Sequence, residues 1–155
     1  MAATLEGLQS VSDCESQSTP NRHFPKGNCS LAHQYELIRV ADARGQTHDF
    51  QVFPLGTPFV ERPGLYVFCA PIAQGNWDAL YVGQTHDLQA RVGTGLSTHH
   101  QYLSAIIAGA THIAVELFPG PETQRLAAEK ELISALSPRL NGTGVGRTAL
   151  FGFKR

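Results

Sequence analysis

Alternating hydrophobic and polar residues in the middle of the chain predict β-strands. The segments YELIRVA (35–41) and THDFQVFPL (47–55) flank the loop DARGQ and together predict a hairpin. Prolines and glycines then interrupt regular pairing over 54–63, which we expect to be a connection.

Two further runs predict a second antiparallel strand pair. In GLYVFCA (64–70) the pattern separates one set of side chains from the other, with Leu65, Val67 and Cys69 on one face and Tyr66 and Phe68 on the opposite face. In ALYVG (79–83) the same rule places Leu80 and Val82 opposite Tyr81. THIAVEL (111–117) predicts a third strand of this group.

Helical periodicity follows these strands. One helix is expected to begin near Leu88, capped by Thr85 or Asp87, and another to span about 100–108. The longest predicted helix runs from Glu122 to Leu136 and ends before Pro138.

A carboxylate lies on the apolar side of this last helix. A helical wheel puts Glu129 in the arc of Leu126, Leu132, Ile133 and Leu136, and puts Glu131 on the opposite side. Because burying an unpaired carboxylate costs several kcal/mol, the position needs a cation, a hydrogen-bond network or a water-lined cleft.

Arg91 stands at the edge of the apolar face of its own predicted helix. Two hypotheses follow. Arg91 and Glu129 form a structural salt bridge, or both surround a phosphate, with Arg91 donating to its oxygens and Glu129 binding Mg²⁺. Two phenols, a guanidinium and a carboxylate suit phosphodiester hydrolysis.

Length and composition are those of one folded domain with appendages. The chain has 155 residues, 42% of them hydrophobic, and a formal net charge of −1. Residues 1–30 are rich in Ser, Pro, Asn and Gly, so we expect a flexible N-terminal arm. From residue 62 onward, eight Lys and Arg residues face six Asp and Glu residues, an excess that permits phosphate binding without predicting it.

Cysteine usage and hydropathy suggest a cytoplasmic protein. The three cysteines form no C-x-x-C pair, which favours free thiols over disulfides or a zinc site. MAATLEGLQS lacks the pattern of a secretory signal, and no run of 18 apolar residues occurs, so we expect no membrane association.

Residues 64–141 resemble the GIY-YIG nucleases. GLY (64–66) stands for the first motif and YVG (81–83) for the second, and Arg91 follows Tyr81 by ten residues. The pattern E-x-x-L-I-x-x-x-x-P-R-L-N then runs from Glu129 to Asn141. Each three-letter motif alone is weak, whereas four pieces at the family's spacing are a specific signal.

The resemblance implies an α/β (α+β) fold with a three-stranded antiparallel sheet flanked by helices. Together with composition and strand pattern, it divides the chain into the arm (1–30), an extra N-terminal β-hairpin (31–61) outside the family core, a nuclease-like domain (62–146) and a tail (147–155). It implies a DNA endonuclease that depends on Mg²⁺ or Mn²⁺, with a protein partner as an open option.

The resemblance also assigns roles to residues. Glu129 would be the single metal ligand, and Arg91 would bind and stabilise the phosphate. Tyr66 and Tyr81 would handle the attacking water, without an indication of which one takes the proton. Gln84 stands where many relatives have lysine and is a candidate substrate contact. Asn141 is also placed at the substrate side, where it would hold the end of the helical region against the site.

Histidines before the second predicted helix add a candidate proton-transfer group. The stretch HHQYLSAIIAGATHIAVEL (99–117) is similar to a subgroup of compact bacterial members. His100, with His99 as the second choice, is our candidate because imidazole titrates near neutrality, although a histidine at a helix start is often a cap or a surface residue. We expect His112 to be structural.

Three alternatives remain open at this stage. Trp77, in a long predicted hairpin loop, could stack on a nucleobase or pack on the sheet. The chain could bind nucleic acid with little or no catalysis, or keep the fold only as a protein-interaction domain. The DNA structure recognised and the biological pathway are not readable from these residues.

Overall fold

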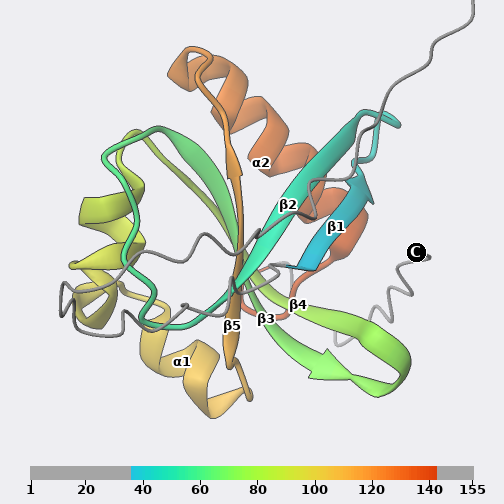
Figure 1. The fold of residues 1–155 in the computed structure, drawn as a ribbon. Helices are drawn as coiled ribbons and strands as arrows, with labels where there is room; N and C mark the ends of the chain where they lie inside the picture. Colours follow the sequence, from blue (N-terminus) through green and yellow to red (C-terminus); the bar gives the residue numbers. More distant parts are fainter. Residues whose placement is uncertain (1–35, 143–155) are drawn as a thin grey trace, which may run out of the picture. The chain divides into compact units, whose positions relative to one another are not determined.

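One antiparallel sheet organises the part of the chain that the structure, a computed structural model, describes, residues 36–142 (Figure 1). Its strand order is β1-β2-β5-β3-β4, with β1 at Glu36–Ala41, β2 at Thr47–Pro54, β3 at Gly64–Ile72, β4 at Asn76–Thr85 and β5 at His112–Leu117. The helices are α1 (Tyr102–Ile107) and α2 (Glu122–Leu136). The predicted arm (1–30) and tail (147–155) lie outside the described residues.

The extra hairpin is confirmed, but the expected three-stranded sheet is wrong. Strands β5, β3 and β4 form the expected trio, and β1 pairs with β2 as a hairpin. β2 also pairs with β5, for example Gln51 opposite Val115, so five strands make one sheet. The physical reason is the free edge of β5, whose backbone groups need partners that β2 supplies.

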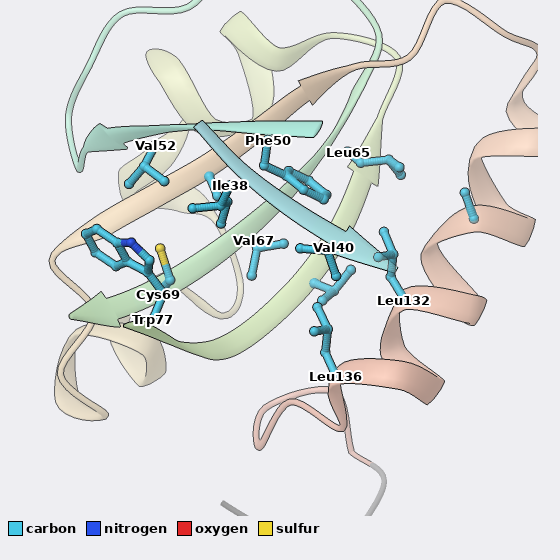
Figure 2. Close-up of a cluster of buried hydrophobic side chains, with 13 residues drawn as sticks. Ile38, Val40, Phe50, Val52, Leu65, Val67, Cys69, Trp77, Leu132 and Leu136 are labelled. Carbon is cyan, nitrogen blue, oxygen red and sulfur yellow. The ribbon is translucent and has the colours of Figure 1, made fainter. Parts of the chain in front are cut away.

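The face of the sheet that α2 covers holds one hydrophobic cluster (Figure 2). Alternation along β1, β2 and β3 supplies its inward side chains, and α2 closes it with residues one helical turn apart. Its large members are Ile38, Val40, Phe50, Val52, Leu65, Val67, Trp77, Val82, Leu132 and Leu136.

The opposite face carries a second cluster, which α1 and two short turns cover (Figure 1). A five-residue π-helical turn spans residues 89–93, and a 3₁₀ turn follows at 96–98. Tyr66, Phe68 and Tyr81 lie in this cluster with Leu88 and Val92 of the turns. The helix predicted near Leu88 is therefore a short π-helical turn, and its N-terminal amide at Ala90 donates to the carboxylate of Asp87 at 3.0 Å.

A β-bulge changes one predicted orientation. The predicted faces of β3 are confirmed, since Leu65 and Val67 lie in the first cluster and Tyr66 in the second. Pairing shifts between Phe68 and Cys69, so that Phe68 opposes Tyr81 and Cys69 opposes Ala79. Leu80 is the extra residue and shares the cluster of Tyr81, contrary to our expectation, because a bulge breaks the period of two.

The bounds of α2 are confirmed, but its buried face is turned from the predicted one. Leu126 is 46% exposed, whereas Arg125 and Ala128 are buried. Glu131, expected on the solvent side, is partly buried and forms a 3.0 Å salt bridge to Arg44 in the loop of the β1–β2 hairpin. The buried stripe of the helix therefore consists of Ala128, Leu132 and Leu136. The loop of the β1–β2 hairpin packs next to this stripe, at Glu131.

Trp77 lies on a strand and not at a loop tip. The connection between β3 and β4 is a three-residue 3₁₀ turn, so the long interval between the two tyrosines consists mostly of strand. Trp77 is buried in the first cluster, with its ring 4.8 Å from that of His112. The packing alternative is the one that the structure supports.

A buried histidine joins the hairpin to the rest of the sheet. His48 on β2 is fully buried, with Nδ1 2.7 Å from Oε2 of Glu116 on β5 and Nε2 3.5 Å from Oδ2 of Asp42. The second distance is an electrostatic contact and not a hydrogen bond. The hydrogen bond to Glu116 raises the pKa of His48 despite its burial, which favours the charged form of a ring that lies between two carboxylates.

None of the helices in residues 36–142 has both the length and the hydropathy needed to cross a membrane.

Candidate functional site

The two motif tyrosines lie side by side on β3 and β4. Their ring centroids are 6.2 Å apart, and Tyr66 is 1% exposed while Tyr81 is 9% exposed. Gly83 stands opposite Tyr66 in the β3–β4 register, and a Cβ there would overlap the Tyr66 ring. The glycine of YVG therefore makes room for the phenol of GLY.

The first motif glycine has a similar steric reason. A Cβ on Gly64 would lie 2.6 Å from the carbonyl oxygen of Glu116 and 2.8 Å from Cδ1 of Leu88. The strand β5 and the turn after β4 both approach the backbone at this point. The glycine of GLY thus lets Leu88 pack tightly on β3, which brings the start of the π-helical turn, and with it Arg91, close to Tyr66.

Two donors converge on the Tyr66 hydroxyl. Nε2 of His99 lies 2.7 Å from it, and Nε of Arg91 donates at 3.4 Å. The backbone amide of Gln101 donates to Nδ1 of His99 at 3.1 Å, which makes Nδ1 an acceptor and assigns the ring proton to Nε2. His99 therefore donates to the oxygen of Tyr66, and the hydroxyl proton of Tyr66 is directed away from His99.

Burial controls the ionisation of these groups. It raises the pKa of Tyr66 far above its ordinary value, an effect that the hydrogen bond from Arg91 opposes only in part. It also raises the pKa of Tyr81, with the charge of Glu129 acting in the same direction. Burial and the nearby charge of Arg91 lower the pKa of His99 to about 4, so this imidazole is neutral at pH 7.

His99 and His100 have different surroundings. His99 is 4% exposed and packs against the second cluster, with T-shaped contacts to Tyr66, Phe68 and Tyr81. His100 is exposed and stacks on His99, and its Nδ1 lies 3.1 Å from Nη2 of Arg91. Of the two candidates from the sequence, the second choice contacts Tyr66 and the first choice contacts Arg91.

Glu129 faces the same region from α2. Its carboxylate accepts a hydrogen bond from the backbone amide of Gln84 on β4, and burial raises its pKa above the ordinary value. Its charge is felt by both tyrosines, and the charge of Arg91 partly offsets its burial. No salt bridge joins it to Arg91 among residues 36–142, so the hypothesis of a structural Arg91–Glu129 salt bridge is not supported.

The environment of Glu129 fits a divalent cation. A half-buried carboxylate that lacks an ionic partner within the described chain has free oxygen lone pairs, and carboxylate oxygen is the ligand that Mg²⁺ prefers. No cluster of three or more His, Cys, Asp or Glu side chains able to hold a metal occurs among the described residues. Any ion here would therefore be held by one protein carboxylate, water and substrate, which is how Mg²⁺ is commonly bound beside phosphates.

Gln84 is tied to a residue that the sequence analysis missed. Its side-chain oxygen accepts a 3.3 Å hydrogen bond from Nε of Arg125, and Nη1 of Arg125 donates to the carbonyl of Gly120 at 2.6 Å. Arg125 is 5% exposed, which is unusual for arginine. The buried guanidinium links the first turn of α2 to the end of β4. In the sequence, Arg125 is a polar residue next to Leu126, and nothing in the helical pattern indicates that its side chain is buried.

Asn141 joins the chain after α2 to the free edge of β4. Its Oδ1 accepts from the Val82 amide at 2.8 Å, and its Nδ2 donates to the Val82 carbonyl at 2.7 Å. Leu140 adds a backbone hydrogen bond to the carbonyl of Leu80 at 3.0 Å. The side chain of Asn141 thus pairs with the backbone of β4 next to Tyr81 as a neighbouring strand would, through both its oxygen and its nitrogen.

Comparison with known proteins adds no assignment, since the chain matches no family model, no curated protein and no solved structure.

Proposed function

We propose that this protein is a divalent-metal-dependent endonuclease of the GIY-YIG type that hydrolyses phosphodiester bonds in DNA. The observation that carries the proposal is the convergence of Tyr66, Tyr81, Arg91 and Glu129 from β3, β4, the π-helical turn and α2. These groups interact electrostatically, since Arg91 lowers and Glu129 raises the pKa of both phenols. A half-buried carboxylate and an arginine without a mutual salt bridge are costly for a scaffold and useful in a phosphodiesterase.

Arg91 is suited to the scissile phosphate. Its Nε and one Nη donate to Tyr66 and His100, which orients the guanidinium plane. The remaining N–H donors are available for phosphate oxygens, where a planar donor pair matches the geometry of the anion. Negative charge that develops in the transition state would then lie beside a fixed positive charge.

Tyr81 is the better placed phenol for contact with the attacking water. Tyr66 is almost fully buried and its oxygen accepts two hydrogen bonds, whereas Tyr81 is the more exposed of the pair. Both pKa values are raised, so both phenols are protonated at neutral pH in the protein alone. Tyr66 is then a positioning group for its neighbour, and Tyr81 orients the water.

Glu129 would hold Mg²⁺ or Mn²⁺ next to the phosphate. Such an ion would supply positive charge that favours the ionised form of a nearby water or phenol and neutralises the leaving oxygen. Glu129 itself contributes the negative charge that retains the ion, and the Gln84 amide keeps its carboxylate oriented.

The direct test is nicking of supercoiled plasmid by the purified full chain with Mg²⁺, Mn²⁺ or EDTA. We expect metal-dependent nicking by the wild type and a loss of about a hundredfold or more in Glu129→Ala, as for removal of a principal electrostatic group. Glu122→Ala is the matched control, because Glu122 is an exposed glutamate on the first turn of the same helix. Far-UV circular dichroism checks that both variants fold.

Two outcomes would replace this proposal. If folded Glu129→Ala nicked plasmid at the wild-type rate, Glu129 would have no role in the cleavage reaction. Retarded migration of DNA without cleavage under any metal condition would favour the alternative, a nucleic-acid-binding module with little or no catalysis.

A further inference from the structure

Helix α1, which begins two residues after His100, exposes large apolar side chains. Leu103 is 70% exposed and Ile107 is 78% exposed, and Ile106 is 40% exposed. Leu103 and Ile107 are four residues apart, so they lie one turn apart on the same face of the helix. Ala105 and Tyr102 attach α1 to the second cluster, and packing therefore does not account for Leu103 and Ile107.

This exposed pair is continuous with the site along the chain. Arg91 contacts His100, and α1 begins two residues later, at Tyr102. The backbone fixes the connection, because the Tyr102 amide donates to the His99 carbonyl at 2.9 Å and the Ala105 amide donates to the Gln101 carbonyl at 2.9 Å. The segment that contacts Arg91 through His100 therefore leads directly into α1, and Leu103 follows His100 by three residues.

The charge of this region suits a polyanion. Residues 88–115 form the π-helical turn, the 3₁₀ turn, α1 and most of β5, and their sequence contains no Asp or Glu. It contains Arg91 and three histidines. Phosphates would meet no carboxylate along this segment, and the partly exposed Arg91 lies at its border with the site.

The other exposed apolar residues of the sheet are in a different electrostatic setting. Leu37 and Leu117 are each 59% exposed and line a groove with Asp49 and Glu116. The two carboxylates are paired with Arg39 and His48, and no Lys or Arg is among the described residues that line the groove, so it offers phosphates no free cation. Exposed hydrophobic residues thus occur with acidic groups on the hairpin side, whereas the segment that holds Leu103 and Ile107 has no Asp or Glu of its own.

We propose that Leu103 and Ile107 form an apolar wedge that contacts unpaired or unstacked bases of DNA bound at the Arg91 site. The inference rests on the proposed function and names its substrate class, DNA that is single-stranded, bulged or branched next to the cleaved bond. Aliphatic side chains that enter a base step must separate stacked bases, which has a free-energy cost in a perfect duplex. A bulge or branch already has unstacked bases, so the wedge binds there without that cost.

The test measures binding in EDTA, where no cleavage occurs. The probes are a duplex with 2-aminopurine in a two-nucleotide bulge and the same duplex without the bulge. We expect the wild type to bind the bulged probe about tenfold or more tightly, and to change its fluorescence. Leu103→Ser/Ile107→Ser should remove the preference while binding the perfect duplex as the wild type does. Leu37→Ser/Leu117→Ser is the matched control, since it removes two exposed leucines of the acidic groove, and should keep the preference.

Several results would overturn the wedge. One is that the wild type binds both probes with equal affinity, and another is that the Leu103→Ser/Ile107→Ser protein keeps the preference for the bulged probe. A third is that the Leu37→Ser/Leu117→Ser control loses that preference to the same extent. A change in oligomeric state of that protein without DNA, seen by size-exclusion chromatography with light scattering, would assign the surface to self-association instead. Nicking with Mg²⁺ is scored separately, so a preference without nicking retains the wedge and rejects the nuclease, and nicking without a preference does the reverse.

Discussion

The Nε2–H of His99 donates to the hydroxyl of Tyr66 across 2.7 Å in a region where both side chains are almost fully buried. The Gln101 amide holds the other ring nitrogen, so the imidazole is fixed in one tautomer and one orientation. The contact binds the segment before α1 to the centre of β3. Through it, the backbone after the 3₁₀ turn determines where the Tyr66 hydroxyl lies.

Removal of this contact should lower the stability of the fold. In His99→Ala, the Tyr66 oxygen loses a buried donor and a cavity forms, so we expect a loss of about 2–4 kcal/mol in the free energy of unfolding. His100→Ala is the adjacent control, and its exposed ring should cost about 0.5 kcal/mol or less. Urea unfolding followed by circular dichroism measures both. Equal stabilities of the two variants would show that the His99–Tyr66 contact contributes little.

His99 should make the stability of the fold decrease as the pH falls below neutrality. Its pKa is lowered to about 4 in the folded protein, whereas an unfolded histidine titrates near about 6.5. The unfolded chain therefore takes up the proton first as pH falls, and the stabilisation present above pH 6.5 is lost between about 6.5 and 4.

His99→Gln isolates this effect because its amide does not titrate. Between pH 6.5 and 4 the wild type should lose on the order of 2–3 kcal/mol more stability than the variant, measured by urea unfolding at each pH. Parallel stability curves for the two proteins would contradict an unprotonated buried His99.

His48 should give the opposite dependence on the alkaline side. Its pKa is raised in the fold by the hydrogen bond to Glu116, with Asp42 acting in the same direction. The stabilisation by the charged ring is complete below the unfolded pKa of about 6.5 and is lost as pH rises through the folded pKa. Thermal unfolding from pH 6 to 9 should show a decline in the wild type that His48→Gln lacks. His112→Gln, a half-buried histidine on β5, serves as control.

The glycine of the second motif gives a steric prediction. A Cβ at position 83 would overlap the ring of Tyr66, which is held by His99 and cannot move away easily. We expect Gly83→Ala to cost about 1–3 kcal/mol of stability through overpacking and to displace the Tyr66 hydroxyl. Gly93→Ala is the control, because the nearest heavy atom to a Cβ there is 3.4 Å away, an ordinary contact. Equal melting temperatures for the two variants would refute the steric reason.

Much of this fold was predictable because its elements have strong local signals. The hairpin, the strands with Tyr66 and Tyr81, and the bounds of α2 follow from alternation, helical period and Pro138. The five-stranded sheet was not predictable, since the pairing of β2 with β5 joins segments that are distant along the chain. A bulge at Leu80 likewise leaves no mark in the hydrophobic pattern.

The members of the candidate site were predictable from the sequence, but the contacts between them were not. Tyr66, Tyr81, Arg91 and Glu129 were named from a motif resemblance together with a misplaced carboxylate, and the structure brings them to one region. The sequence could not distinguish His99 from His100, because neighbouring histidines differ only in where the backbone directs them. Arg125 was missed since nothing in a helical pattern separates a buried arginine from an exposed one when its partners, Gln84 and Gly120, lie outside that helix.

A cation at Glu129 should stabilise the fold by an amount that its concentration and its affinity determine. Binding to the native state alone adds RT ln(1 + [L]/Kd), so Mn²⁺ at about a hundred times its Kd stabilises by about 2.7 kcal/mol. We therefore expect the melting temperature of the EDTA-treated wild type to rise with Mn²⁺ and to return when EDTA is added again. Glu129→Gln should show no such rise, because its neutral amide keeps the shape of the side chain and loses the charge. The same titration with Glu131→Gln is the control, since Glu131 pairs with Arg44 at the other side of the helix, and its response to Mn²⁺ should equal that of the wild type. A full response in Glu129→Gln would place the cation elsewhere on the protein.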